Sequence, residues 1–255
     1  MEIALPGGVD NAGAVVRAGA TVRRPGGPNA GPVRAFLAHL ERAGFTGAPR
    51  FLGMDAAGRE VLTFLPGAVA LPPFPDWAAT DDLLHSVAAL QRDLHAAAAG
   101  FTGGPWVPRR LPPGAGGDLV CHTDVCLENV VVRGGAAVAF IDFDLALPVD
   151  RLVDIAVAAR HWVPLRDPAD IADARAGTDL AARFHRFTAV HGLDAAGRTR
   201  VLDLLDGFLV VSLDTIRTWA AEGHPGYAAM WAAGYEPMNL RSRTWLTAQR
   251  AALAS

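Results

Sequence analysis

The chain has 255 residues, 51% of them hydrophobic, and its 23 basic and 26 acidic residues give a formal net charge of −3. This length is enough to bury a core in one large domain or two small ones, and the charge balance excludes a strongly basic nucleic-acid-binding protein. No apolar stretch reaches the roughly 20 residues that span a bilayer, and the first residues contain no basic or long apolar signal segment. We therefore expect a cytoplasmic monomer or homodimer with neither a membrane nor a nucleic-acid partner.

Residues 1–66 predict a small antiparallel sheet with one helix. The short apolar runs that end in Gly or Pro, typical of strands, are EIALPGG, AGAVVRAG, TVRRPGG, PRFLGM and REVLTFL. Between the third and fourth of these runs, apolar residues recur at helical spacing over residues 32–43, and Gly44 is a stop signal. The segment GGVDNAG (residues 7–13) is rich in glycine but lacks the G-x-G-x-x-G pattern of a phosphate-binding loop.

The rest of the chain predicts a larger, mostly helical lobe. Residues 67–78 are rich in proline and are interpreted as a connector or hinge, which leaves residues 79–255 for the second lobe. Thr80 can cap a helix that continues to about residue 99. Further helices are expected near residues 153–162, 169–192, 195–221, 225–234 and 240–253. The sequence thus predicts an α+β fold with a small β-rich lobe, a connector, and a helical lobe that carries one hairpin.

Polar residues lie on both sides of that predicted hairpin, in the stretch CHTDVCLENVVVRGGAAVAFIDFD. The runs VVV and AAVAFI form its strands, and Gly134-Gly135 suits a tight turn between them. The polar residues are His122, Asp124 and Asn129 before the first strand, and Asp142 and Asp144 after the second. Because the strands are adjacent and antiparallel, the entry loop and the exit residues lie at the same end. We therefore expect Asp124, Asn129 and Asp142 to converge.

These residue types suit phosphoryl transfer. Two carboxylates and a carboxamide oxygen are hard ligands that match Mg²⁺ better than a softer metal. A transferred phosphoryl group needs positioning and charge neutralisation, and one carboxylate can orient the attacking hydroxyl and accept its proton. The pattern H-x-D-x₄-N alone is only suggestive, but an apolar hairpin and I-D-F-D follow it at the right distance.

The motifs resemble those of the aminoglycoside phosphotransferase and choline kinase family, whose fold is bilobal and protein-kinase-like. HTDVCLEN is similar to its catalytic loop, FIDFDLA to its metal-binding segment, VDRLVDIA to the helix start that follows, and VLTFLPG to the strand that enters the hinge. The resemblance implies a phosphotransferase that uses ATP or GTP with Mg²⁺ and acts on a hydroxyl of a small molecule. Several acceptor classes fit this resemblance equally well: aminoglycoside-like antibiotics, other antibiotics, choline-like amines, sugars and amino alcohols.

The resemblance also implies roles for individual residues. Asp124 matches the catalytic base and His122 the residue that braces the catalytic loop, so these two are the catalytic candidates. The metal candidates are Asn129, Asp142 and Asp144, of which the first two also count as nucleotide-binding. Asp154 matches an acid that supports the loop from below. Phe64 and Leu65, in the VLTFLPG segment, are expected to lie against the adenine.

One departure from the family pattern concerns its phosphate-binding Lys, because this chain contains no Lys. In TVRRP the first substitute is Arg24 and the second Arg23, since neighbouring strand residues point to opposite faces and only one reaches the cleft. The family pairs its Lys with a Glu on the small-lobe helix. The only acid of the helix predicted here is Glu41, near its end, while the expected position falls near Val33 or Arg34. We therefore expect this ion pair to be missing or rebuilt.

Two alternatives follow from these departures. The chain can be a kinase-fold protein that binds a nucleotide or another ligand but transfers nothing. A less favoured hypothesis is a zinc-dependent hydrolase whose ligands are Cys121, His122, Asp124 and Cys126. It leaves Asp142 without a role, and the two cysteines are more simply interpreted as buried small hydrophobic residues.

The acceptor pocket is expected in the helical lobe after residue 160. Its aromatic residues are most simply interpreted as core. Asp203, Asp206 and Asp214 fall on one predicted helix, where they offer a possible acidic rim to a cationic acceptor.

Overall fold

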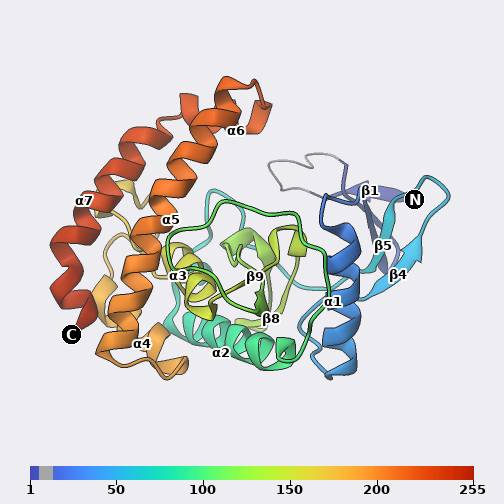
Figure 1. Cartoon of the computed structure of the whole chain (residues 1–255), viewed down its shortest axis with the longest axis horizontal. Coiled ribbons are helices and arrows are strands. Elements are labelled where there is room, and N and C mark those ends of the chain that lie inside the picture. Colours follow the sequence, from blue (N-terminus) through green and yellow to red (C-terminus); the bar gives the residue numbers. More distant parts are fainter. Residues whose placement is uncertain (6–13) are drawn as a thin grey trace.

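The computed structural model describes residues 1–5 and 14–255, and the glycine-rich segment at 7–13 lies outside the described residues. The first part of the chain is a five-stranded antiparallel sheet with the strand order β1-β2-β3-β5-β4. The strands are β1 (Glu2–Ala4), β2 (Val16–Ala18), β3 (Thr21–Arg24), β4 (Phe51–Met54) and β5 (Glu60–Thr63). Helix α1 (Ala30–Arg42) lies between this sheet and the rest of the chain (Figure 1) and buries its apolar face. The predicted small sheet with one helix is confirmed.

The remainder of the chain is mostly helical and carries two pairs of short strands. Its helices are α2 (Asp81–Ala98), α3 (Arg151–Trp162), α4 (Leu180–Val190), α5 (Ala195–Ala221), α6 (Pro225–Ala232) and α7 (Tyr235–Ala254). Its strands are β6 (Leu119–Cys121), β7 (Val130–Arg133), β8 (Ala136–Phe140) and β9 (Leu147–Val149). β7 and β8 form the predicted hairpin, and Gly134 and Gly135 have φ of 58° and 80°, as a tight two-residue turn requires. None of the helices in the described part of the chain is both long and apolar enough to cross a membrane.

The helix predicted over residues 169–192 is wrong in its first half. α4 begins at Leu180, and the residues before it form a short 3₁₀ helix (Pro168–Asp170) and turns. Asp173 accepts hydrogen bonds from the backbone and side chain of Arg175, and Asp179 caps α4. Side-chain bonds of this kind compete with helical backbone bonds, which explains why the apolar spacing did not continue as a helix.

Backbone hydrogen bonds hold the small sheet against the hairpin of the larger part. The amide of Ala68, in the connector, donates to the carbonyl of Val132 at 2.9 Å, and the amide of Val132 donates back at 2.7 Å. The amide of Phe140 donates to the carbonyl of Gly47 at 2.9 Å. These bonds join the connector to β7, and the segment before β4 to the open end of the hairpin. The lobe boundaries at residues 66 and 79 stay predictions.

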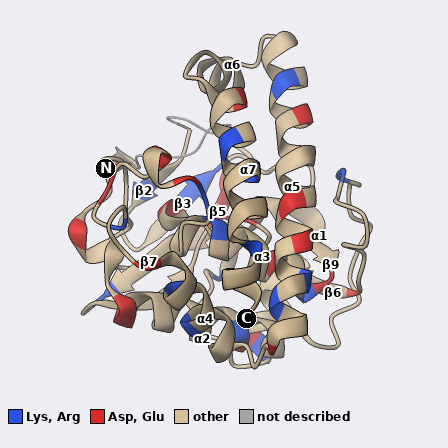
Figure 2. Ribbon diagram, turned by 90° about the vertical axis from the view of Figure 1, so that its left-hand side faces the viewer, with Lys and Arg blue, Asp and Glu red and all other residues tan. Residues whose placement is uncertain are grey.

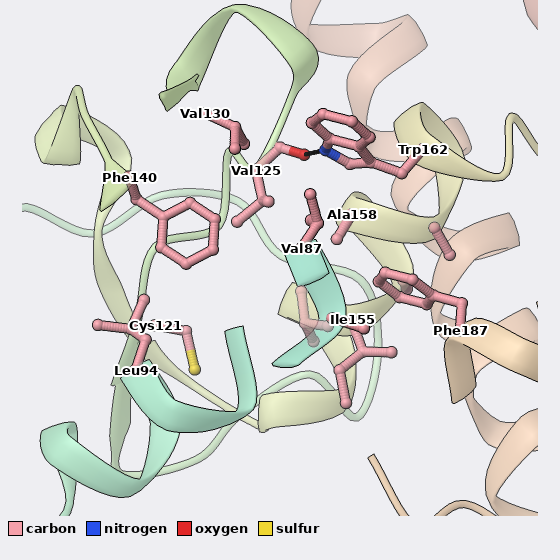
Figure 3. Close-up of a cluster of buried hydrophobic side chains, with 14 of the residues drawn as sticks. Val87, Leu94, Cys121, Val125, Val130, Phe140, Ile155, Ala158, Trp162 and Phe187 are labelled. Carbon is pink, nitrogen blue, oxygen red and sulfur yellow. Dashed lines mark hydrogen bonds between the residues drawn. The ribbon is translucent and has the colours of Figure 1, made fainter. Parts of the chain in front are cut away.

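The main core lies directly beneath the loop that precedes β7. Figure 3 shows part of it, with side chains from α2, β6, β8, α3 and α4 packed around Val125 and Val130. Trp162, at the end of α3, is fully buried, and its Nε1 donates to the carbonyl of Val125 at 3.1 Å. The polar loop is therefore supported by a closely packed hydrophobic core.

Next to this core, His191 is buried without a hydrogen-bond partner among the described residues. Its ring lies 5.3 Å from the ring of Phe187 and 6.2 Å from that of His95. Burial, and then the nearby His95, lower the pKa of His191 from 6.5 to about 3. As the pH falls below 6.5, the unfolded chain therefore gains a proton at this residue that the folded chain does not accept.

We expect this difference to make the protein less stable in acid. Between pH 7 and pH 5 the residue lowers the free energy of unfolding by about 2 kcal/mol. The variant His191→Leu should show a correspondingly smaller loss when urea unfolding is measured at the two pH values. His85→Leu, which changes an exposed histidine of α2, is the control and should keep the wild-type difference. A His191→Leu profile that parallels the wild type would contradict this assignment.

Candidate active site

His122 braces the loop between β6 and β7. The side chain is fully buried, and its ring packs 4.5 Å from the ring of Phe143. Its Nδ1 accepts from the amide of Asp124 at 3.3 Å, which leaves Nε2 to donate to the carbonyl of Ile141 at 2.9 Å. Both of its ring nitrogens bind backbone, as suits a residue that braces the loop, and a catalytic role for His122 stays a prediction.

Thr123 is held in an unusual conformation beside the candidate base. Its φ is 59°, which is rare for a β-branched residue. Its amide donates to Asp154 Oδ1 at 2.6 Å, its hydroxyl donates to the carbonyl of Leu145 at 2.6 Å, and Arg109 Nη2 donates to that hydroxyl at 2.7 Å. The strain at Thr123 thus persists because three separate contacts hold it. Sequence reasoning did not find Arg109, which lies in a segment with no recognisable motif.

Asp154 supports the loop from the core, at the position that the resemblance implied. It is fully buried and accepts hydrogen bonds from Gln91 Nε2 at 2.9 Å and His95 Nε2 at 2.8 Å as well as from Thr123. Burial alone would raise the pKa of Asp154, but the bond and charge of His95 and the bond of Gln91 outweigh it, so this pKa lies below its usual value. The carboxylate is therefore a stable, charged anchor for the loop.

Asn129 joins the two halves of the site. Its Nδ2 donates to the carbonyl and to Oδ2 of Asp124, at 3.0 and 2.8 Å, and its own carbonyl accepts from the amide of Ile141 at 2.9 Å. Burial raises the pKa of Asp124, and the charge of Asp142 raises it further, while Arg109 and the Asn129 bond oppose this. Asp124 and Asp142 therefore lie close enough to interact, as the antiparallel hairpin predicted.

Arg24 points from β3 into the same region. It is 6% exposed, and its guanidinium contacts three carboxylates: Glu60 at 3.2 Å, Asp142 at 3.0 Å, and Asp144. Arg23 lies on the opposite face of the strand, where its Nη1 is 3.4 Å from Glu2. Of the two arginines proposed from the sequence, only Arg24 lies with the site residues, because neighbouring strand positions alternate faces.

The sequence predicted that the family's ion pair with the small-lobe helix would be missing or rebuilt. The structure shows it rebuilt, with the acid supplied by a strand instead of the helix. Glu60 of β5 is directly opposite Arg24 in the β3–β5 register and is 1% exposed. Arg34 of α1, near the position expected for the helix acid, has its Nε 3.8 Å from Glu60 Oε1. The helix therefore presents a cation and the strand the acid. Sequence reasoning missed Glu60; pairing the two predicted strands REVLTFL and TVRRPGG is the signal that would have found it.

A cavity of about 270 Å³ opens beside these residues. Arg24, Asn129 and Asp142 line it together with Phe64 and Leu65, the two hinge residues proposed from the sequence. Much of its lining is apolar and comes from Leu5, Val15, Val22, Leu62, Val69, Leu71, Val131 and Ile141. A cavity that is apolar along most of its wall and charged at one part suits a ligand with a flat apolar ring and an ionic end. Glu128 also lines it, which the sequence did not indicate.

The donor set fits a magnesium ion. Carboxylate oxygens of Asp142 and Asp144 and the amide oxygen of Asn129 are the hard donors that Mg²⁺ prefers. Asn129 turns its Nδ2 toward Asp124, which directs its oxygen away from that residue. Asp142 has φ of 61°, a left-handed conformation that Asp tolerates better than most residues and that turns the chain sharply after β8.

The four residues of the zinc hypothesis do not form one ligand group. Among the described residues, the group of metal-ligating types close enough to share an ion is His95, Cys121 and Asp154, in which Asp154 already accepts several hydrogen bonds. Burial raises the pKa of the Cys121 thiol well above its usual value and also raises that of Cys126. Both cysteines are free, and Cys121 is buried in the core, as expected for a small hydrophobic residue.

Known proteins are similar to this chain in sequence. Residues 105–189, which include the loop, the hairpin and α3, match the model of a phosphotransferase enzyme family. The trifolitoxin immunity protein of Rhizobium leguminosarum bv. trifolii is 30% identical over 269 residues, which cover 99% of this chain and 97% of that protein.

Solved structures share the fold at low sequence identity. A choline/ethanolamine kinase family protein from Mesorhizobium loti superposes with a TM-score of 0.57 at 16% identity, over 100% of this chain and 88% of its own. Choline kinase from Cryptosporidium parvum superposes with a TM-score of 0.55 at 11% identity, over 97% of this chain and 93% of its own. An aminoglycoside phosphotransferase from Alicyclobacillus acidocaldarius gives 0.53 at 14%, over 94% and 87%. A relative is similar along its whole length, the family model matches the loop and hairpin, and the fold is bilobal and protein-kinase-like, so the chain belongs to the phosphotransferase enzyme family.

Proposed function

We propose that this chain transfers the γ-phosphate of ATP or GTP to a hydroxyl group of a small molecule. The observation that carries the proposal is the convergence of Asp124, Asn129 and Asp142 at the open end of one hairpin, beside a cavity that Arg24 also lines. Family membership supports small-molecule phosphoryl transfer in general. The donor nucleotide, its metal ion, and the roles of the individual residues are part of the proposal, as is action in the cytoplasm, where the donor is abundant.

Asp124 is the proposed base. Its Oδ2 is fixed by Asn129, and its Oδ1 makes no hydrogen bond to any residue that the structure describes. This oxygen is free to orient the acceptor hydroxyl and to take its proton. As the acceptor oxygen bonds to the γ-phosphorus, the bond from that phosphorus to the β–γ bridging oxygen breaks, and the nucleoside diphosphate leaves with that electron pair.

Asn129, Asp142 and Asp144 are the proposed ligands of Mg²⁺. When bound, the ion neutralises charge on the phosphates of the nucleotide. Arg24 adds a fixed positive charge at the same end of the cavity, where its planar guanidinium can bind phosphate oxygens. Phe64 is proposed to contact the adenine at the apolar part of the cavity.

One observation favours the second candidate, an inert nucleotide-binding protein. Arg24 contacts both Asp142 and Asp144, so the guanidinium already neutralises two of the carboxylates proposed to hold the metal. Arg24 must share or release these contacts when Mg²⁺ binds. An inert binder would take up the nucleotide without a need for the ion.

The relative named as a trifolitoxin immunity protein supports a toxin or antibiotic as the acceptor class. Modification of a hydroxyl on such a compound is a direct route to protection against it. We therefore propose a screen in which purified protein, Mg²⁺ and ATP or GTP are incubated with antibiotics, peptide toxins, sugars and amino alcohols, and nucleoside diphosphate release is measured. We expect release to depend on one acceptor class. Tight nucleotide binding with no acceptor-dependent release would favour the inert binder.

Glu60 gives a separate test of the nucleotide end of the site. In Glu60→Gln, Arg24 loses its buried partner on β5, and we expect the affinity for Mg·AMP-PNP in calorimetric titration to fall about tenfold, which corresponds to about 1.4 kcal/mol. Glu41→Gln is the matched control, because Glu41 is exposed on α1 and pairs with the exposed Arg50. Equal affinities of the Glu60→Gln variant and the wild type would show that Glu60 does not position Arg24 for the nucleotide.

A further inference from the structure

Arg109 lies beside the proposed base, on the segment between α2 and β6. Its Nη2 bonds to the hydroxyl of Thr123, the residue immediately before Asp124. Arg109 is partly buried, and burial lowers the pKa of Arg109, while the charges of Asp124 and Tyr227 oppose this. Arg109 does not line the cavity that holds Arg24 and Asp142. It therefore contacts the catalytic loop outside the proposed nucleotide site.

No carboxylate oxygen of the described residues lies within the 4.0 Å ion-pair distance of Arg109. Its neighbour Arg110, by contrast, has Nη1 3.0 Å from Asp214. The carboxylate with the largest effect on its charge is Asp124, which must stay free to accept a proton from the acceptor. A partly buried cation is stabilised when an anion binds it, so the Arg109 guanidinium can bind an anionic ligand.

The acids once expected to form a rim for a cationic acceptor are already paired. Asp203 and Asp206 of α5 contact Arg250 and Arg243 of α7, and Asp214 contacts Arg110. Figure 2 shows acidic segments on α5 and basic segments on the neighbouring α7. These α5 carboxylates are therefore already paired with arginines, and they offer little attraction to a cationic acceptor.

Two further arginines lie at and just after the end of α3. Arg160 Nη2 donates to Tyr235 Oη at 3.2 Å, and Arg166 Nη2 donates to the carbonyl of Arg160. Within the described part of the chain, neither guanidinium lies within ion-pair distance of an acid. Burial, and then Arg160, lower the pKa of Arg166 to about 10. The Arg160 guanidinium also lies 5.6 Å from the centre of the Phe208 ring, so this basic group packs against α5 and α7.

We propose that the acceptor carries an anionic group, such as a carboxylate, sulfate or phosphate, and that Arg109 binds this group beside the hydroxyl that receives the phosphoryl group. This inference rests on the proposed function and specifies its acceptor class. A guanidinium binds such anions through two parallel hydrogen bonds, which also orients the acceptor toward Asp124. A polycationic or quaternary ammonium acceptor would instead meet a like charge next to the base.

Sulfate is the probe for this site. The protein is first saturated with Mg·AMP-PNP, and sulfate is then titrated by calorimetry at constant ionic strength. We expect the wild type to bind sulfate, Arg109→Gln to bind it at least tenfold more weakly, and Arg109→Lys to recover part of the affinity. Arg110→Gln, changed at the neighbouring arginine that already has an acid partner, should bind like the wild type. Equal sulfate affinity of the wild type and Arg109→Gln, or no sulfate binding at all, would overturn the proposal.

The nucleotide itself is a second source of an anion, and a separate comparison distinguishes it. Arg109→Gln should bind Mg·ADP and Mg·AMP-PNP as the wild type does. A selective loss of AMP-PNP affinity would assign Arg109 to the γ-phosphate and overturn the proposal.

Steady-state kinetics distinguish a direct contact of Arg109 with the acceptor from a role of Arg109 in folding the loop. With an anionic acceptor from the screen, Arg109→Gln should raise the acceptor KM at least tenfold and leave the nucleotide KM unchanged. A fall in kcat alone, or turnover of cationic acceptors only, would overturn the proposal. If the wild type binds no Mg·AMP-PNP, the proposed function fails, and the sulfate titration of the nucleotide-free variants still decides whether Arg109 binds an anion.

Discussion

Asp124→Asn should lower kcat by roughly 10²- to 10⁴-fold, the usual contribution of a positioned general base. Asparagine keeps the size of the side chain but cannot take the proton of the acceptor hydroxyl, because its amide has no comparable basicity. The contact to Asn129 Nδ2 holds Asp124 in place, so the variant should retain the folded loop and the affinity for Mg·AMP-PNP. The measurement is the steady-state rate of nucleoside diphosphate release with the acceptor found in the screen.

Asp118→Asn is the matched control, since Asp118 is exposed and lies just before β6. It should turn over like the wild type. If Asp124→Asn retains activity within about tenfold of the wild type, Asp124 is not the base. In that case the hydroxyl proton has another acceptor, and the convergence of Asp124 with Asp142 has a structural meaning only.

Asp154→Ala should be among the most destabilising single substitutions in the chain. It removes a fully buried carboxylate and leaves the side chain of His95 and the amide of Thr123 without their acceptor, while Gln91 keeps only its bond to the Asp154 carbonyl. Breaking a buried charged network of this kind costs about 3–5 kcal/mol of unfolding free energy. We expect urea unfolding to show a loss of that size, while Asp93→Ala, an exposed position on α2, stays within about 0.5 kcal/mol of the wild type.

Asp154 also makes the free energy of unfolding depend on pH, and the sign of this dependence follows from its lowered pKa. Because the pKa of Asp154 is lowered in the folded chain, its stabilising contribution is fully present above the pKa of an unfolded Asp, about 3.9, and is lost as the pH falls through the lower folded value. In Asp154→Ala this acid-dependent part of the unfolding free energy should be absent. An Asp154→Ala variant as stable as the wild type would mean that the loop is anchored elsewhere.

Most of the site lies on the stretch that its sequence singles out. Asp124, Asn129 and Asp142 are near one another because two antiparallel strands joined by a glycine turn bring their open ends together, which is a local consequence of pattern. The choice of Arg24 over Arg23 likewise follows from alternation along a strand. These are short-range rules, and the structure agrees with them.

The contacts that sequence reasoning missed all join distant segments. Glu60 meets Arg24 only because β3 pairs with β5, and Arg109 meets Thr123 only because an irregular segment crosses the loop. The helix expected before α4 failed for a related reason, since Asp173 and Asp179 bond to nearby backbone instead. Such contacts depend on register and on loop path, which periodicity does not encode.

The most direct test of the account is the magnesium dependence of nucleotide binding. Titrating AMP-PNP into the wild type and into Asp142→Asn, each with Mg²⁺ and with EDTA, measures whether Asp142 holds the ion beside the nucleotide. We expect Mg²⁺ to tighten binding to the wild type by at least tenfold and Asp142→Asn to lose most of this gain. Binding that is equally tight in EDTA, or a full Mg²⁺ effect in Asp142→Asn, would contradict it.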